Sequence, residues 1–218
     1  MKQQKLSALK ILTFLLSISL SNAYKPVVLL HGIMSDAASM LVIAEEIKIH
    51  HPGTIVYVID KFNNWQSLEH ALGQIESLYE DFDEIFLKHP DGVNVLGYSQ
   101  GGLIARTMTQ FYQNHKVKKL ISLSSPQAGQ FGDAFLHLIF PSLFARNAYE
   151  LFYSRIGQRT SVGNYWNDPN QRQLYLRYSE FLPYVNNEVL STNSSLFRDN
   201  LLLLDQLNTE KRMQMTSN

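Results

Sequence analysis

Hydrophobic residues along this chain fall into short continuous runs separated by longer stretches with helical spacing. Continuous apolar runs rich in β-branched residues are typical of strands buried on both faces of a parallel sheet. Four runs predict strands: residues 25–30 (KPVVLL), 54–59 (TIVYVI), 93–96 (VNVL) and 117–123 (VKKLISL). The stretches between them predict amphipathic helices over residues 36–49, 65–88 and 101–113. This alternation indicates an α/β fold built on a parallel sheet.

The pattern changes after Ser124-Ser125-Pro126. Residues 131–181 are rich in Phe, Tyr and Leu at helical spacing and contain no clear strand. We expect them to form a helical cap inserted over the carboxyl edge of the sheet, where α/β sheets bind ligands. Residues 201–204 are expected to begin a last apolar strand, which stops at the polar tail NTEKRMQMTSN.

The first 23 residues predict a secretory signal peptide. Lysines precede an apolar run over residues 11–20, and Ser21 and Ala23 are small residues suited to cleavage after Ala23. The alternative is a membrane anchor, but a spanning helix needs about 20 apolar residues. We therefore expect a single mature domain over residues 24–218, without a transmembrane anchor, that enters the secretory pathway.

Composition narrows the possible partners and chemistry. The 218 residues contain 19 basic and 19 acidic side chains, so nothing indicates a nucleic-acid partner. The chain has no cysteine, so no disulfide, thiol nucleophile or cysteine-ligated metal is available to it. Asn193-Ser194-Ser195 fits the N-glycosylation pattern in a polar, exposed-looking stretch.

The segment VNVLGYSQGG carries the strongest chemical signal. Gly97, Ser99 and Gly101 fit the G-x-S-x-G nucleophile elbow, in which a serine lies on a strained turn between a strand and a helix. The pattern alone is weak, but here a strand precedes it and a helix follows it, as the motif requires. We expect Ser99 to be a catalytic nucleophile, the alternative being an ordinary turn.

A serine nucleophile also needs two N–H donors for the oxyanion and a histidine base. The donors expected from position are the N–H of Gln100 and the N–H of Ile33, in the loop after the first strand. His31 in that loop is expected to hold the loop, because in this fold the base follows the serine. His115 and His137 do follow it, but His115 is expected on the wrong side of the helix, and Asp133 with His137 suggests surface neighbours.

Five segments together resemble the palmitoyl-protein thioesterases, with most similarity to the type 2, lysosomal branch: YKPVVLLHGIMSDAASM, HPGTIVYVID, GYSQGGLIAR, LISLSSPQAGQFGD and NYWNDP. The resemblance implies an α/β-hydrolase fold that cleaves the thioester between a fatty acyl group and cysteine or coenzyme A. It places Ser99 at the nucleophile and Ile33 and Gln100 at the oxyanion positions. The implied partner is an S-acylated protein, a peptide or acyl-CoA, in the lysosome or outside the cell, acted on by a monomer without metal or cofactor.

The chain also departs from the family pattern. The family's Gly-Pro-Asp-Asp-Gly-like acid loop and its Ser-His-like segment have no counterpart here, so we expect a C-terminally truncated member. A catalytically dead lipid- or partner-binding fragment is one alternative, and a lipase or carboxylesterase, which shares the elbow, is another. Phe152 and Gly163 occupy positions where relatives tend to carry cysteines, which suggests the loss of a pair.

The aromatic cap suits an acyl-chain site. The candidate lining residues are Phe131, Phe135, Phe140 and Phe144, together with Leu138, Ile139, Leu143 and Phe152. The alternative for each of them is simple packing of the cap on the sheet.

Overall fold

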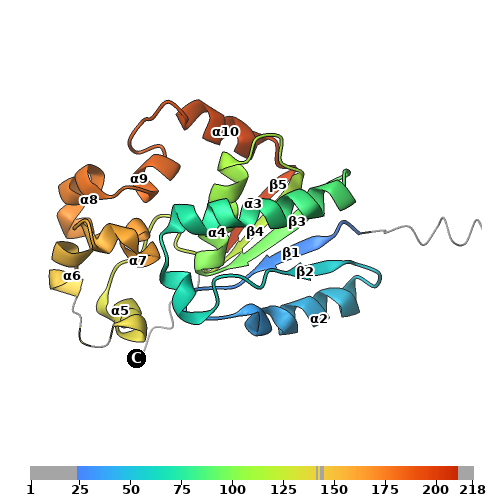
Figure 1. Cartoon of the computed structure of the whole chain (residues 1–218), viewed down its shortest axis with the longest axis horizontal. Helices are drawn as coiled ribbons and strands as arrows, with labels where there is room; N and C mark the ends of the chain where they lie inside the picture. The colour runs from blue at the N-terminus through green and yellow to red at the C-terminus, as the bar shows by residue number, and fades with distance from the viewer. Residues whose placement is uncertain (1–23, 141, 143–144, 211–218) are drawn as a thin grey trace, which may run out of the picture.

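The fold is a five-stranded parallel sheet with helices on both faces and a cap of short helices at one edge (Figure 1). The computed structural model describes residues 24–140, 142 and 145–210. The strand order is β2-β1-β3-β4-β5, and all neighbours are parallel. The strands are β1 (Val27–Leu30), β2 (Val56–Val58), β3 (Val93–Tyr98), β4 (Val117–Leu123) and β5 (Gln206–Glu210). The four strands that the apolar runs predict are all present, which confirms the α/β class.

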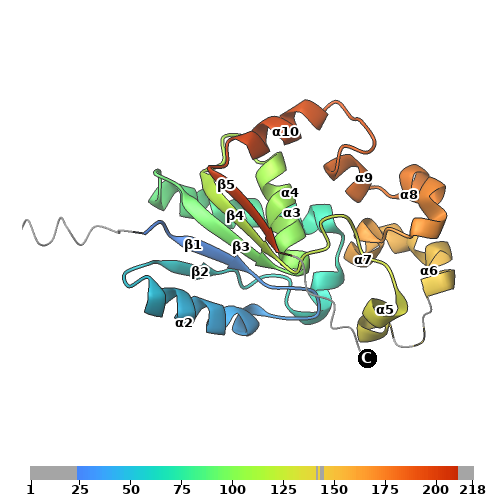
Figure 2. The ribbon, with the colours of Figure 1, turned by 180° about the vertical axis from the view of Figure 1, so that it is seen from behind.

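The helices separate by face (Figure 2). On one face α2 (Leu41–His50) packs against a small cluster that contains Leu29, Ala44 and Leu96. On the other, α3 (Ala71–Lys88) and α4 (Gln100–Phe111) cover the large core, and α10 (Ser194–Leu202) packs against α4. Strand residues alternate between the two clusters because successive side chains point to opposite faces.

Two of the three predicted helices begin later as α-helices than their apolar patterns suggest. Residues 36–49 start as the 3-10 turn η1 (Ala37–Met40), where Asp36 Oδ1 accepts the Ser39 N–H at 3.1 Å, and continue as α2. Residues 65–88 divide into the 3-10 turn η2 (Asn64–Leu68) and α3, whose first turn is capped by His70 Nδ1.

The prediction that a strand begins at residues 201–204 is wrong. Leu201 and Leu202 end α10, and the strand that follows is the polar segment Gln206–Glu210. The physical reason is position: β5 pairs only with β4 in the described sheet, so much of it faces solvent and needs few apolar side chains.

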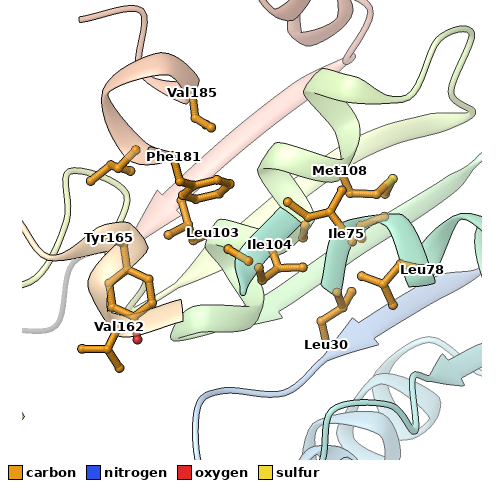
Figure 3. Close-up of a cluster of buried hydrophobic side chains, with 14 of the residues drawn as sticks. Leu30, Ile75, Leu78, Leu103, Ile104, Met108, Val162, Tyr165, Phe181 and Val185 are labelled. Carbon is orange, nitrogen blue, oxygen red and sulfur yellow. The ribbon is translucent and has the colours of Figure 1, made fainter. Parts of the chain in front are cut away.

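The cap lies beyond the carboxyl ends of the strands (Figure 1). Its elements are α5 (Asp133–Ile139), α6 (Ala145–Phe152), η3 (Gly157–Arg159), α7 (Ser161–Tyr165), η4 (Pro169–Gln171), α8 (Arg172–Tyr178) and α9 (Leu182–Val185). Figure 3 shows Val162 and Tyr165 of α7 in the same buried cluster as Leu103 and Ile104 of α4. The cap therefore shares one core with the helix that follows Ser99.

Candidate active site

Ser99 lies on a strained turn at the carboxyl end of β3. Its backbone has φ +52° and ψ −125°, and its N–H donates to Leu123 O of the neighbouring strand at 2.8 Å. A positive φ is rare outside glycine and costs of the order of 1–3 kcal/mol, so it persists only where the surroundings impose it. α4 begins at the next residue, which directs the positive end of the helix dipole toward the serine.

Glycines allow three backbone segments to meet under this turn. A Cβ at Gly97 would lie 2.4 Å from Gly102 Cα, and a Cβ at Gly101 would lie 2.3 Å from His31 O. Neither distance is tolerable for a side chain, so glycine is required at both positions for close approach. The G-x-S-x-G pattern therefore has a direct steric cause here.

The loop after β1 passes directly beside Ser99. β1 and β3 pair in a register that ends at Leu30 opposite Gly97, so the residues after each strand leave the sheet together. A Cβ at Gly32 would lie 3.0 Å from Ser99 Cβ. In the part of the chain that the structure describes, the Ile33 N–H has no hydrogen-bond acceptor, and Gln100, as the first residue of α4, has no helical partner for its own N–H.

The Gln100 side chain points into the interior. It is buried, its Nε2 donates to Ser67 O at 2.7 Å, and its Oε1 accepts from the Tyr165 hydroxyl at 3.0 Å. Sequence reasoning missed Ser67 and Tyr165, because neither belongs to a motif.

The structure places His31 as a support of the loop, as expected. Its Nδ1 lies 2.8 Å from Gly32 O and its Nε2 lies 2.9 Å from Lys61 O. His115 lies at the amino end of β4, the edge of the sheet opposite Ser99, with its Nε2 2.8 Å from Asn200 O. Burial lowers the pKa of His115 below its usual 6.5.

No described residue makes a hydrogen bond with Ser99 Oγ. Asp133 and His137 lie in the first and last turns of α5. The structure thus places Ser99 beside the loop after β1 and at the start of α4, and no described histidine forms a hydrogen bond with Ser99 Oγ.

Three of the candidate acyl-site residues, Phe131, Phe135 and Phe140, are half-buried and pack against aromatic side chains of the cap. Phe131 lies 5.2 Å from Trp166, Phe135 lies 6.3 Å from Tyr165, and Phe140 lies 6.2 Å from Phe152, measured between ring centroids. Phe152 itself is buried, and Leu143 and Phe144 lie outside the described residues. These contacts favour a packing role for each ring, and each of the three residues remains partly exposed.

Phe152 and Gly163, the two positions at which the loss of a cysteine pair is predicted, are joined by one side chain. Gln158 Nε2 donates both to Phe152 O at 2.7 Å and to Gly163 O at 2.9 Å. A Cβ at Gly163 would lie 2.1 Å from Gly157 O, so this backbone leaves no room for a side chain there. One buried amide thus joins the two segments.

Among the described residues, no helix combines the length and the hydrophobicity that a membrane-spanning segment needs. The same residues also contain no group of three or more His, Asp or Glu side chains placed to hold a metal ion.

Comparison with known proteins identifies the family. A family model described as palmitoyl protein thioesterase matches residues 26–214, almost the whole of the described chain. The chain belongs to the palmitoyl protein thioesterase family. The resemblance in the sequence motifs is thereby confirmed.

Two curated relatives of this family carry lysosomal names. The Drosophila melanogaster "Lysosomal thioesterase PPT2 homolog" is 58% identical over 191 residues, which cover 88% of this chain and 66% of that protein. The human "Lysosomal thioesterase PPT2" is 40% identical over 186 residues, which cover 85% of this chain and 62% of that protein. The chain thus spans somewhat less than two thirds of the length of both.

Solved structures support the fold. The lipase BlEst2 of Bacillus licheniformis in its propeptide form gives a TM-score of 0.52 at 16% identity, covering 87% of this chain and 36% of that one. The mature form of the same lipase gives a TM-score of 0.50 at 16% identity, covering 81% of this chain and 64% of that one. The α/β-hydrolase fold is therefore confirmed.

Proposed function

We propose that the chain carries the nucleophile and the oxyanion donors of a hydrolase that cleaves fatty-acyl thioesters, with Ser99 as the nucleophile. The observation that carries this proposal is the strained turn at Ser99, held against the Gly32 loop by backbone contacts that only glycine permits. Membership of the palmitoyl protein thioesterase family supports the substrate class.

In this mechanism Ser99 Oγ attacks the thioester carbonyl carbon. The tetrahedral oxyanion accepts hydrogen bonds from the N–H groups of Ile33 and Gln100. Collapse breaks the C–S bond, releases the thiol and leaves an acyl ester on Ser99, which water then hydrolyses to the free fatty acid. Losing one such oxyanion donor costs about 10²–10³ in turnover in other hydrolases.

A general base must remove the hydroxyl proton before or during attack. No histidine of the described chain forms a hydrogen bond with Ser99 Oγ, and triads stripped of members retain only about 10³–10⁴-fold acceleration over water. We therefore expect the 218-residue chain to hydrolyse a palmitoyl thioester near the background rate. This same observation favours a second candidate function, in which the chain binds an acyl group without turning it over.

The acyl chain is proposed to lie along the partly exposed aromatic side chains of the cap, namely Phe131, Phe135 and Phe140. Burying each methylene is worth about 0.8 kcal/mol, so a long chain binds without charged contacts. The substrate is then an S-acylated protein, a peptide or acyl-CoA, recognised mainly through its acyl group.

We also propose that the chain reaches the lysosome or the exterior. The signal peptide prediction concerns residues 1–23, which lie outside the described residues. Asn193 is exposed and immediately precedes α10, so its side chain is accessible to glycosylation. Enzymatic deglycosylation of secreted material should shift the band of the parent but not of Asn193→Gln; an unshifted parent band would contradict this proposal.

The test compares three polypeptides for palmitoyl-thioester hydrolysis: the 218-residue chain, the same chain extended by the C-terminal segment of a relative, and the extended chain with Ser99→Ala. Turnover by the extended chain that Ser99→Ala abolishes is the expected result. Equal turnover with and without Ser99 would refute the nucleophile. Preference of the extended chain for glycerides over thioesters would favour a lipase instead.

A further inference from the structure

We propose that Ser67 is a positioning residue that fixes the two halves of the oxyanion hole relative to each other. This proposal rests on the proposed role of Ser99, Ile33 and Gln100. Ser67 lies in η2, between β2 and α3, and only 1% of its surface is exposed. It belongs to no catalytic motif, and its role comes from what its hydroxyl and its carbonyl contact.

The hydroxyl of Ser67 holds the loop after β1. The Met34 N–H donates to Ser67 Oγ at 2.7 Å, and Ser67 Oγ donates in turn to Asn64 O. Met34 has φ +52°, a conformation that is unfavourable for a methionine and needs support from its surroundings. Because Met34 directly follows Ile33, the bond to Ser67 restrains the segment that carries the first oxyanion donor.

The carbonyl of Ser67 holds the elbow. Ser67 O accepts from Gln100 Nε2 at 2.7 Å, from Gln74 Nε2 at 2.9 Å and from Ser161 Oγ at 2.8 Å. Gln100 carries the second oxyanion donor, so one residue contacts both halves of the site. Each bond is buried, and breaking a buried bond leaves an unsatisfied polar group.

Further hydrogen bonds hold the segment before Ser67 against the loop after β1. The Asn64 N–H donates to Ser35 O at 2.6 Å, and His31 Nε2 lies 2.9 Å from Lys61 O. The segment 61–67 therefore runs along the oxyanion loop and fixes it at several points. Ser67 adds the connection across to Gln100 and, through Ser161, to the cap.

The cap also contacts Gln100 directly, through a second side chain. The Tyr165 hydroxyl donates to Gln100 Oε1 at 3.0 Å, and complete burial raises the pKa of this phenol, so it remains a donor. Gln100 is thus held between η2 and α7. The position of the Gln100 N–H therefore depends on Ser67 and Tyr165, which lie 33 and 65 positions away in the sequence.

The experiment uses the full chain and two readouts. Amide hydrogen exchange over residues 31–36 reports the order of the oxyanion loop, and the rate at which a fluorophosphonate probe labels Ser99 reports the chemistry. In Ser67→Ala we expect loop exchange to rise about tenfold and Ser99 labelling to fall about tenfold, the size expected for a buried hydrogen bond. Exchange in β3 and α4 should stay unchanged, which shows that the variant is folded.

The matched control is Ser161→Ala, which removes one donor to the same Ser67 carbonyl and leaves the Met34 bond in place. We expect its loop exchange and labelling to stay within about threefold of the parent. Ser67→Thr retains the hydroxyl and should recover most of both readouts. Ser67→Cys keeps the side-chain volume but offers only a weak acceptor, so it should behave like Ser67→Ala without a cavity.

Loop exchange and labelling within twofold of the parent, in folded Ser67→Ala and Ser67→Cys, would overturn the proposal. An equal loss in Ser161→Ala would also overturn it, because the effect would then belong to general packing. Failure of the probe to label Ser99 in the parent would contradict the proposed function instead, and loop exchange would still decide the role of Ser67.

Discussion

Gly101 and Gly73 are both helical glycines, but their surroundings differ in a way that bears on the elbow. A Cβ at Gly101 would meet two backbone carbonyl oxygens, those of His31 at 2.3 Å and Leu30 at 2.6 Å. A Cβ at Gly73, in α3, would meet no atom of the described chain within 4 Å outside its own helix backbone and neighbours. Alanine at Gly101, compared with alanine at Gly73, therefore tests how closely the backbone segments pack under Ser99.

We expect Gly101→Ala to lower the free energy of unfolding by about 1–3 kcal/mol or more, because backbone atoms must move. Gly73→Ala should raise it by about 0.5–1 kcal/mol, because alanine favours the helix. Urea unfolding of both variants and the parent measures these changes. A Gly101→Ala variant as stable as the parent would show that β1 and α4 are not packed this closely.

At the scale of single residues, the sequence reveals what is local. Ser99, Gly97 and Gly101 lie within five positions, so their motif encodes the turn that the structure shows. The sequence does not reveal the role of Ser67, because its partners Gln100 and Ser161 lie 33 and 94 positions away, and nothing in a buried serine indicates which carbonyl or amide it will meet.

At the scale of elements, the apolar pattern predicts β1 to β4 well and fails at the chain's last strand. Residues of β1 and β3 belong to the buried clusters on both faces of the sheet, and this burial favours continuous apolar runs. Residues 201–204 look like such a run, but α10 uses Phe197 and Asn200 for burial and leaves Leu202 and Leu203 exposed. Periodicity cannot separate a short apolar helix end from a buried strand.

The docking of α10 on α4 should depend on one aromatic pair. Phe197 and Phe111 stack with ring centroids 4.3 Å apart, and Phe197 is 5% exposed. We expect Phe197→Ala to destabilise the fold by about 3–5 kcal/mol, as for other buried phenylalanines. Leu202→Ala, on the same helix but 69% exposed, should change stability by less than about 0.5 kcal/mol. If the two substitutions lowered the melting temperature equally, α10 would not bury the face that carries Phe197.

His115 joins β4 to α10 and should make stability depend on pH. Its folded pKa lies below 6.5 because burial disfavours the charged ring, so the unfolded chain binds its proton more tightly. The resulting stability is complete above about pH 6.5 and is lost as the pH falls through the folded pKa.

Urea unfolding at pH 7.5 and at pH 5.0 tests this sign. The parent should lose more stability between these two values than His115→Gln, which keeps a donor for Asn200 O but does not titrate. A parent that loses no more than the variant would show that the ring titrates equally in both states.

At the scale of the whole molecule, sheet and cap form one packed unit around the elbow. Leu103 and Ile104 of α4 share a core with Val162, Tyr165 and Phe181 of the cap (Figure 3). The sequence places an aromatic-rich helical segment after β4, but its docking on α4 depends on contacts between distant segments. This arrangement places the cap, which carries the proposed acyl site, in direct contact with Gln100.

The central claim is that Ser99 is the nucleophile of this fold, and site mapping of a covalent adduct tests it most directly. The chain is treated with a fluorophosphonate probe, digested, and each serine-containing peptide is examined by mass spectrometry. We predict that the adduct forms on Ser99 faster than on any other serine and disappears in Ser99→Ala, which retains its fold. Labelling of Ser124 or Ser125 at the same rate as Ser99, or unchanged labelling of the Ser99→Ala chain, would contradict the account.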